Sequence, residues 1–301
     1  VEKRPIYGYL VGAGKNRILM WSQMHGNEST TTKSLIDFWS YLNTVQAKFI
    51  LNECTFLMIP QLNPDGSEAY SRLNANKIDL NRDFNDLSQP ESRLLKEIFD
   101  DFKPNYCFNL HGQRTIFSAG NTSIPATISF LAPSADLERS LTSAREIAMK
   151  LIVATKNKLQ SYLPNAIGRY DDAFNIKCAG DYFTFQGTPT VLFEAGHYPE
   201  DYKRIKSRKA VFDSIIQMCE VISLKKIHSF SIADYFEIPE NHKNLRDIEI
   251  FNLKGTSKGI SSSKNKVFVQ YIEKKKEGKV VLLPCFDTVS YTHLRAHETD
   301  S

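Results

Sequence analysis

The stretch "NRILMWSQMHGNESTTTKSLIDFWSYLN" (residues 16–43) decides the fold. Its opening run, residues 16–24, is almost continuously apolar, as a fully buried strand is. Residues 29–43 place Leu35, Ile36, Trp39 and Leu42 at helical spacing behind Ser and Thr residues that favour a helix start. Polar "HGNE" (25–28) separates the two segments. The stretch therefore predicts a buried strand, a polar turn and a helix.

The same order recurs along residues 1–225. Apolar runs with a polar end occur in "CTFLMIPQLNPDG" (54–66), "NYCFNLHG" (105–112) and "TPTVLFEAGH" (188–197), and a further strand is expected over 126–133. Helical patterns cover residues 87–104, 134–160 and 201–224. Apolar strands that alternate with helices predict an α/β fold with a mainly parallel sheet covered on both faces. Ligands of such sheets bind beyond the carboxyl ends of the strands, so we expect the four polar ends to gather there.

The composition narrows the class of protein. The chain has 301 residues, of which 42% are apolar and 24% charged, as in ordinary globular proteins. A formal charge of +4 is too balanced to favour a nucleic-acid or membrane partner. The start of the chain shows no secretory signal pattern. The five cysteines are scattered without CxxC spacing, which predicts free thiols in a reducing compartment and a cytoplasmic protein.

Three segments are expected. Residues 1–225 form the catalytic α/β domain, which lacks its start because the chain opens at "VEKRPIYGYLVG" without an initiator Met. Residues 226–288 mix lysine, Gly/Ser stretches and short alternating runs, which predicts a small, truncated β-rich appendage. Residues 289–301 are expected to be a non-native tail, because "VSYTHLRAHET" (289–299) resembles a translated sequencing adapter. The HxxxH pair His293 and His297 is therefore excluded as a metal site.

Candidate metal ligands lie at two of the polar ends. Zinc takes His nitrogen and carboxylate oxygen, and catalytic zinc keeps one position open. His25 and Glu28 supply two ligands from one turn, and His111 ends the next strong strand. Each residue alone is more often structural, but three at neighbouring strand ends predict one zinc site.

Other polar residues suggest a hydrolase. Glu194 ends an apolar strand, where a carboxylate can take a proton from water and pass it to a leaving amine. Arg72, Asn81 and Arg82 lie in "NPDGSEAYSRLNANKIDLNRDF" (63–84). One arginine can hold a substrate carboxylate while the other faces a developing oxyanion.

Together these pieces resemble the zinc carboxypeptidase family (peptidase family M14). The resemblance rests on "HGNE", "NPDG", an Arg nine positions after that Asn, "DLNRDF", a strand ending "LHG" and a strand ending in Glu, over residues 5–225. "NLHGQR" and "FEAGHYPEDY" further resemble a Bacteroidetes-type subgroup. The resemblance implies a three-layer α/β/α sandwich with a mixed, mostly parallel sheet. It also implies one Zn²⁺ and a peptide substrate.

The resemblance assigns roles to these residues as well. It makes His25, Glu28 and His111 the zinc ligands, Glu194 the general base and acid, and Arg72 the residue that polarises the carbonyl. Asn81 and Arg82 would hold the terminal carboxylate of the substrate. The capping tyrosine of the family has two candidates, Tyr170 and Tyr182, and either can equally be a packing residue. Asp171, Asp172 and Asp181 can select a basic side chain or be ordinary loop acids.

Two alternatives to a metallocarboxypeptidase stay open. The separation between Glu28 and His111 is short, which is similar to the aspartoacylase and succinylglutamate desuccinylase branch, whose members are N-acyl-amino-acid deacylases. A non-catalytic metal-binding module is the other alternative, and the presence of both Glu194 and Arg72 disfavours it.

Overall fold

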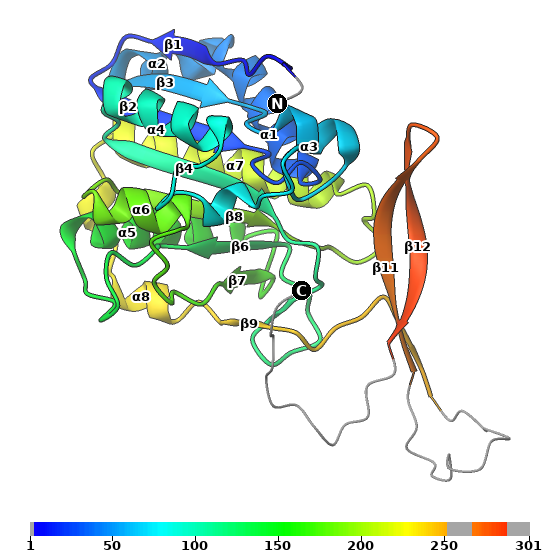
Figure 1. Cartoon of the computed structure of the whole chain (residues 1–301). Helices are drawn as coiled ribbons and strands as arrows, with labels where there is room; N and C mark the ends of the chain where they lie inside the picture. Colours follow the sequence, from blue (N-terminus) through cyan, green and yellow to red (C-terminus); the bar gives the residue numbers. More distant parts are fainter. Residues whose placement is uncertain (1–2, 252–266, 288–301) are drawn as a thin grey trace, which may run out of the picture. The chain divides into compact units, whose positions relative to one another are not determined.

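A computed structural model describes residues 3–251 and 267–287 of the chain (Figure 1). The chain divides into two compact units, residues 1–244 and 245–301. The proposed non-native tail, residues 289–301, lies outside the described residues. In the described part of the chain, none of the helices combines the length and apolar character that a membrane span needs.

The first unit is built on a seven-stranded sheet with the order β1-β3-β2-β4-β8-β6-β7. Its strands are β1 (Tyr9–Gly12), β2 (Asn16–Ser22), β3 (Cys54–Ile59), β4 (Tyr106–Gly112), β6 (Ile128–Leu131), β7 (Ile167–Arg169) and β8 (Thr190–Ala195). The central strands β3, β2, β4 and β8 are parallel to one another. Strand β1 and the pair β6–β7 run in the opposite direction. The prediction of a mixed, mostly parallel sheet is confirmed.

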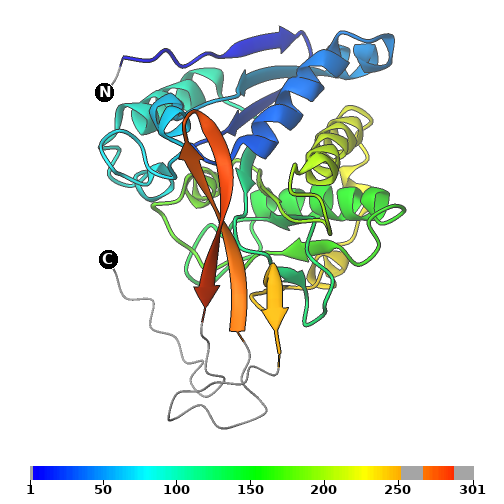
Figure 2. The ribbon, with the colours of Figure 1, turned by 90° about the vertical axis from the view of Figure 1, so that its right-hand side faces the viewer.

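Helices cover both faces of this sheet (Figures 1 and 2). They are α1 (Ser29–Leu42), α2 (Lys48–Glu53), α3 (Pro64–Ala69), α4 (Pro90–Phe102), α5 (Ser143–Leu159), α6 (Ala179–Phe185), α7 (Ile205–Ser223) and α8 (Ala233–Phe236). Short 3-10 turns occur at η1 (Val45–Ala47), η2 (Leu80–Arg82) and η3 (Ile227–Ser229), and β5 (Ser118–Ala119) pairs with β9 (Asn241–His242).

The two faces of β2 belong to different hydrophobic cores. Ile18 and Met20 pack in the core shared with α1, α2, α5 and α7, whereas Leu19 and Trp21 pack in the core shared with α4 and α6. All four side chains are fully buried. Burial of each such side chain contributes about 1.5–3 kcal/mol. An unbroken apolar run was therefore the correct signal of a central parallel strand.

The second unit contains a three-stranded antiparallel sheet of β10 (Ile248–Ile250), β11 (Val267–Lys276) and β12 (Lys279–Asp287). This agrees with the prediction of a small β-rich region. The division falls after Asn244, however, and not after residue 225. Residues 226–244 pack with the first unit because they bury Tyr235 and Ile238, and the Tyr235 hydroxyl accepts a hydrogen bond from the Ala132 N–H at 3.1 Å.

Candidate metal centre

The four polar strand ends follow β2, β3, β4 and β8, which are neighbouring parallel strands, so they lie along one edge of the sheet. "NPDG" forms the start of α3, where the Asn63 side chain accepts a hydrogen bond from the Gly66 N–H at 2.8 Å. Gly26 of "HGNE" packs backbone to backbone against Gly66. A Cβ atom on Gly26 would lie 1.9 Å from the Gly66 carbonyl carbon, so this close approach requires glycine.

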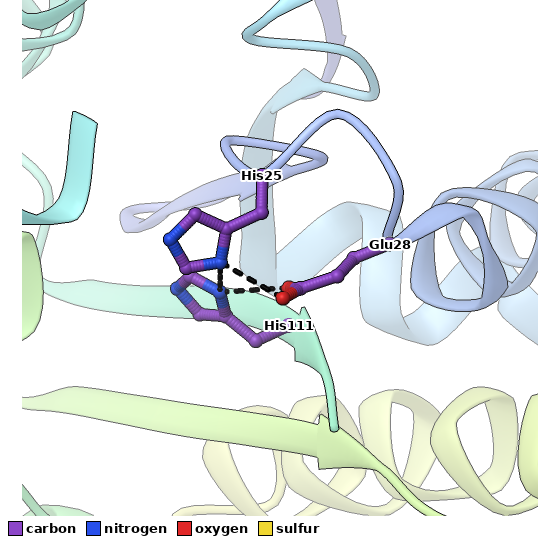
Figure 3. Close-up of side chains that lie close together, drawn as sticks. All are labelled: His25, Glu28 and His111. Atoms are coloured by element: carbon purple, nitrogen blue, oxygen red, sulfur yellow. Dashed lines mark hydrogen bonds and ion pairs between the residues drawn. The ribbon is translucent and has the colours of Figure 1, made fainter. Parts of the chain in front are cut away.

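Three buried side chains converge at this edge: His25, Glu28 and His111 (Figure 3). One ligand atom from each lies within 4.8 Å of the other two. The Nδ1 atoms of His25 and His111 are 3.2 Å apart. Glu28 Oε1 lies 2.9 Å from His25 Nδ1, and Glu28 Oε2 lies 3.1 Å from His111 Nδ1.

These separations suit a zinc ion. A tetrahedral zinc with bonds of about 2.0–2.1 Å holds its ligand atoms about 3.3–3.4 Å apart, slightly wider than the edges found here. Two imidazole nitrogens and one carboxylate are also a donor set that zinc accepts, with a position left open. The residues present therefore fit the metal.

The electrostatics favour a positive charge at the centre of the three ligands. Burial disfavours the charged form of His25, but the carboxylates of Glu28 and Asp79 outweigh it and raise the pKa of His25 to about 9. Burial also opposes ionisation of Glu28, but His25 and His111 hold its pKa well below the ordinary value. Burial lowers the pKa of His111. The ionised Glu28 and the raised pKa of His25 show that the site stabilises a positive charge, which zinc would supply on displacing the proton of His25.

Asp79 contacts His25 on the side away from the other two ligands, and the sequence did not predict this role. Its Oδ1 atom lies 3.0 Å from His25 Nε2, and its Oδ2 atom accepts from Arg72 Nε at 3.0 Å. A carboxylate on the far nitrogen fixes the ring so that Nδ1 faces the other ligands. Hydrogen bonding and the charge of His25 outweigh burial and keep the pKa of Asp79 well below its usual range. The available signal was its place in "DLNRDF", two residues before Asn81.

Glu194 lies next to the three ligands. It is the register partner of His111 on the adjacent strand. Its Oε2 atom is buried and has no hydrogen-bond partner among the described residues. Burial and the nearby charge of Glu28 raise the pKa of Glu194 well above its ordinary value. A buried carboxyl group without a structural partner is a candidate for proton transfer.

The structure gives Arg72, Asn81 and Arg82, the three predicted substrate-contacting residues, different contacts and different exposure. Arg72 Nη1 lies 3.7 Å from Glu28 Oε1, with 46% of its side chain exposed. Asn81 is buried, and its Oδ1 atom accepts from the Ala179 N–H at 3.0 Å, which leaves the amide NH₂ as the end that can donate to an anion. Arg82 is exposed, and its Nη1 atom donates to the Asn81 carbonyl at 2.7 Å.

The two tyrosine candidates differ. The Tyr170 hydroxyl donates to Gln113 Oε1 at 3.1 Å, and Gln113 follows His111 by two residues. Tyr182 packs instead against Phe84 and Phe183 in the core. Only Tyr170 is therefore brought near the ligand-bearing edge.

The three aspartates considered for substrate selection, Asp171, Asp172 and Asp181, also differ in their surroundings. Arg145 and Arg139 bind the Asp172 carboxylate, so Asp172 anchors its loop and is not available to a substrate. Asp171 is exposed. Asp181 is buried, and its Oδ1 atom accepts from the Asn175 N–H at 3.1 Å.

The comparison with known sequences agrees with this geometry. Residues 1–117 match the family described as zinc carboxypeptidase, Peptidase M14. Carboxypeptidase 2 of Trichophyton rubrum is 31% identical over 113 residues, which is 37% of this chain and 20% of that protein. The chain thus spans about a fifth of the length of the curated relatives it matches.

Solved structures share the fold. A metallo-carboxypeptidase from Pseudomonas aeruginosa, in complex with (2-guanidinoethylmercapto)succinic acid, is similar with a TM-score of 0.58 and 16% identity, over 74% of this chain and 62% of that one. The succinylglutamate desuccinylase/aspartoacylase of Rhodobacter sphaeroides is similar with a TM-score of 0.52 and 16% identity, over 72% of this chain and 59% of that one. The ordered motifs and the match over residues 1–117 thus make this chain similar to the zinc carboxypeptidases of peptidase family M14, and the solved structures show that it shares their fold.

Proposed function

We propose that this chain is a zinc-dependent metallocarboxypeptidase that releases the C-terminal residue of peptides. The observation that carries the proposal is the convergence of His25, Glu28 and His111 beside Glu194, whose buried Oε2 atom has no hydrogen-bond partner in the part of the chain that the structure describes. Residues 1–244 would form the catalytic unit, since every residue of the site lies within it. The free cysteines support a cytoplasmic location.

His25, Glu28 and His111 would hold one zinc ion. Zinc bound there would supply Lewis acidity, which polarises a carbonyl and acidifies water. Asp79 keeps His25 oriented for this task through its bond to Nε2. Arg72 would face the carbonyl oxygen as negative charge develops on it.

Glu194 would move the proton. As water attacks the carbonyl carbon, the Glu194 carboxylate accepts a proton from it. The burial that favours the protonated form keeps this proton on Glu194 until the C–N bond breaks. The proton then passes to the departing amine nitrogen, and Glu194 returns to its carboxylate form.

The remaining residues would select a free carboxylate. The Arg82 guanidinium and the Asn81 amide NH₂ are suited to bind the terminal carboxylate of a peptide by charge-assisted hydrogen bonds. Tyr170 would contact the substrate from the side of Gln113. An amide bond next to a free carboxylate is therefore the expected cleavage site.

The experiment is a release profile on a peptide library, read by mass spectrometry, with zinc content measured on the same sample. We expect one zinc per chain, removal of single C-terminal residues, and loss of activity with a chelator that zinc restores. Peptides with an amidated C-terminus are the matched control and should not be cleaved. Metal-free protein without chelator-sensitive hydrolysis would contradict the proposal.

An N-acyl-amino-acid deacylase is the second candidate. The fold similarity to the Rhodobacter sphaeroides protein supports it, and the same ligands and base would serve. Such an enzyme also requires a carboxylate next to the cleaved amide, so the two candidates differ in what lies on the acyl side. Comparison of N-acetyl and N-succinyl amino acids with tripeptides at equal concentration separates them. Faster cleavage of the tripeptides supports the carboxypeptidase.

A further inference from the structure

We propose that Arg204 is a positioning residue that holds the ends of β4 and β8, and thereby His111 and Glu194, at a fixed separation. This inference rests on the proposed function, because it concerns the spacing between a zinc ligand and the base. Arg204 lies directly before α7 and is only 8% exposed.

The guanidinium of Arg204 binds the backbone directly behind the site. Its Nη1 atom lies 3.2 Å from the Gln113 carbonyl oxygen, 3.3 Å from that of Ala195 and 3.1 Å from that of Gly196. Gln113 follows His111 by two residues, and Ala195 follows Glu194 directly. One cation therefore contacts carbonyls from both strand ends.

Further contacts also hold the backbone at the end of β8. The Ser207 hydroxyl donates to the Gly196 carbonyl at 2.8 Å. A Cβ atom on Gly196 would lie 1.9 Å from the Ala126 carbonyl oxygen, so this close approach of the two backbones requires glycine. Arg204 itself adopts the left-handed region, with φ 57° and ψ 34°, which is costly for a residue other than glycine. Such strain persists where surrounding contacts impose it.

His197 also binds the guanidinium of Arg204. Arg204 Nη2 donates to His197 Nε2 at 2.9 Å, so the imidazole is a neutral acceptor. Burial and the charge of Arg204 lower the pKa of His197 to about 2, which keeps it in this role. The contact fixes the chain three residues beyond Glu194.

Contacts with several carbonyl oxygens at once require the planar guanidinium group of arginine. It presents several N–H donors in fixed directions, whereas the single ammonium of lysine cannot reproduce them. Without Arg204, the backbone hydrogen bonds between β4 and β8 would be left to hold the two strand ends in place. A displacement of about 1 Å at a reacting group can cost about 10²-fold in rate.

The test compares Arg204→Lys with the wild type. Two quantities are measured: the zinc affinity of the metal-free protein, by competition with a chromophoric chelator, and kcat and KM at saturating zinc. We expect zinc affinity about 10-fold weaker and kcat about 10–100-fold lower, with KM within about 2-fold. Arg208→Lys is the matched control, because Arg208 lies in the first turn of α7, is half-exposed and binds Asp37 on α1.

Arg204→Gly keeps the test valid if the lysine variant is poorly folded. Glycine suits the left-handed backbone, so this variant removes the clamp while relieving strain. It should show the same losses at an unchanged melting temperature. Zinc affinity and kcat within 2-fold of the wild type in either folded variant would overturn the role of Arg204. If the wild type binds no zinc, the proposed function is refuted. If the wild type binds zinc but does not hydrolyse peptides, the zinc affinities of the wild type and the variants still test the role of Arg204.

Discussion

His111 and Glu194 are register partners on the adjacent parallel strands β4 and β8. Neighbouring strands lie about 4.8 Å apart, and partners in register point to the same face of the sheet. The proposed zinc ligand and the proposed base are therefore held one strand spacing apart by backbone hydrogen bonds. The two groups therefore lie on adjacent strands in the middle of the seven-stranded sheet.

Replacing Glu194 with Gln should separate metal binding from turnover. Glutamine has nearly the same shape but cannot accept the proton from water. We expect kcat to fall about 10²–10⁴-fold while zinc content stays at the wild-type level. Single-turnover assays with zinc analysis on the same preparation check this. A variant that keeps near-normal rates would rule out Glu194 as the base.

Asp79 should control zinc affinity without binding the metal. Asp79→Asn retains a partner for His25 Nε2 but removes the negative charge that also binds Arg72. We expect zinc affinity to fall about 10–100-fold. Competition with a chromophoric chelator measures it. Asp100→Asn on α4 is the control, since Asp100 is exposed and pairs only with Lys96 among the contacts found. Equal affinities in the two variants would contradict the role of Asp79.

The sheet and the convergence of the three candidate ligands could be predicted because both depend on local signals in the sequence. The largely apolar runs of β2, β4 and β8 favour central parallel strands, and the polar residues that follow such strands lie at the same edge of the sheet. His111 lies beside Glu194 because β4 and β8 are neighbours in the sheet. The order of the strands could not be predicted from local sequence patterns.

Specific side-chain contacts, some local and some between distant segments, explain the features that the sequence did not predict. The pattern over 134–160 suggested one helix, but α5 begins at Ser143, because Thr142 caps it by accepting from the Arg145 N–H at 3.4 Å. The pattern over 87–104 likewise suggested an earlier start, but α4 begins at Pro90, and the Ser88 hydroxyl and N–H before it both donate to Asp83. The role of Arg204 likewise depends on carbonyls from two other segments, so its sequence context is uninformative.

Arg82 should contribute to substrate binding and little to the chemical step. Arg82→Ala removes a charge-assisted hydrogen bond worth about 1.5–3 kcal/mol, which corresponds to a 10–150-fold lower kcat/KM. We expect most of this change in KM, because the terminal carboxylate is bound equally in the ground state and the transition state. Steady-state kinetics on one tripeptide provide the measurement. Arg93→Ala, an exposed arginine on α4 that donates to the Leu87 and Ser88 carbonyls, is the control. A loss confined to kcat would contradict carboxylate binding by Arg82.

Asp181 should make the stability of the protein depend on pH. Burial raises the pKa of Asp181 to about 6, above the value of about 3.9 in an unfolded chain. Below pH 4 both states hold the proton and there is no penalty. Between pH 4 and 6 the unfolded state releases its proton first, so stability falls as pH rises, and the full penalty applies above pH 6. A shift of this size corresponds to roughly 2–3 kcal/mol.

Asp181→Asn removes this penalty and keeps an oxygen that accepts from the Asn175 N–H. The variant should therefore be about 2 kcal/mol more stable than the wild type at pH 7.5 and equally stable at pH 4, within the error of the measurement. Urea unfolding followed by circular dichroism at both pH values provides the free energies. Asp171→Asn, at an exposed carboxylate of the same segment, is expected to change the free energy of unfolding by less than about 0.5 kcal/mol. A difference between wild type and Asp181→Asn that is the same at both pH values would show that ionisation of Asp181 is not its cause.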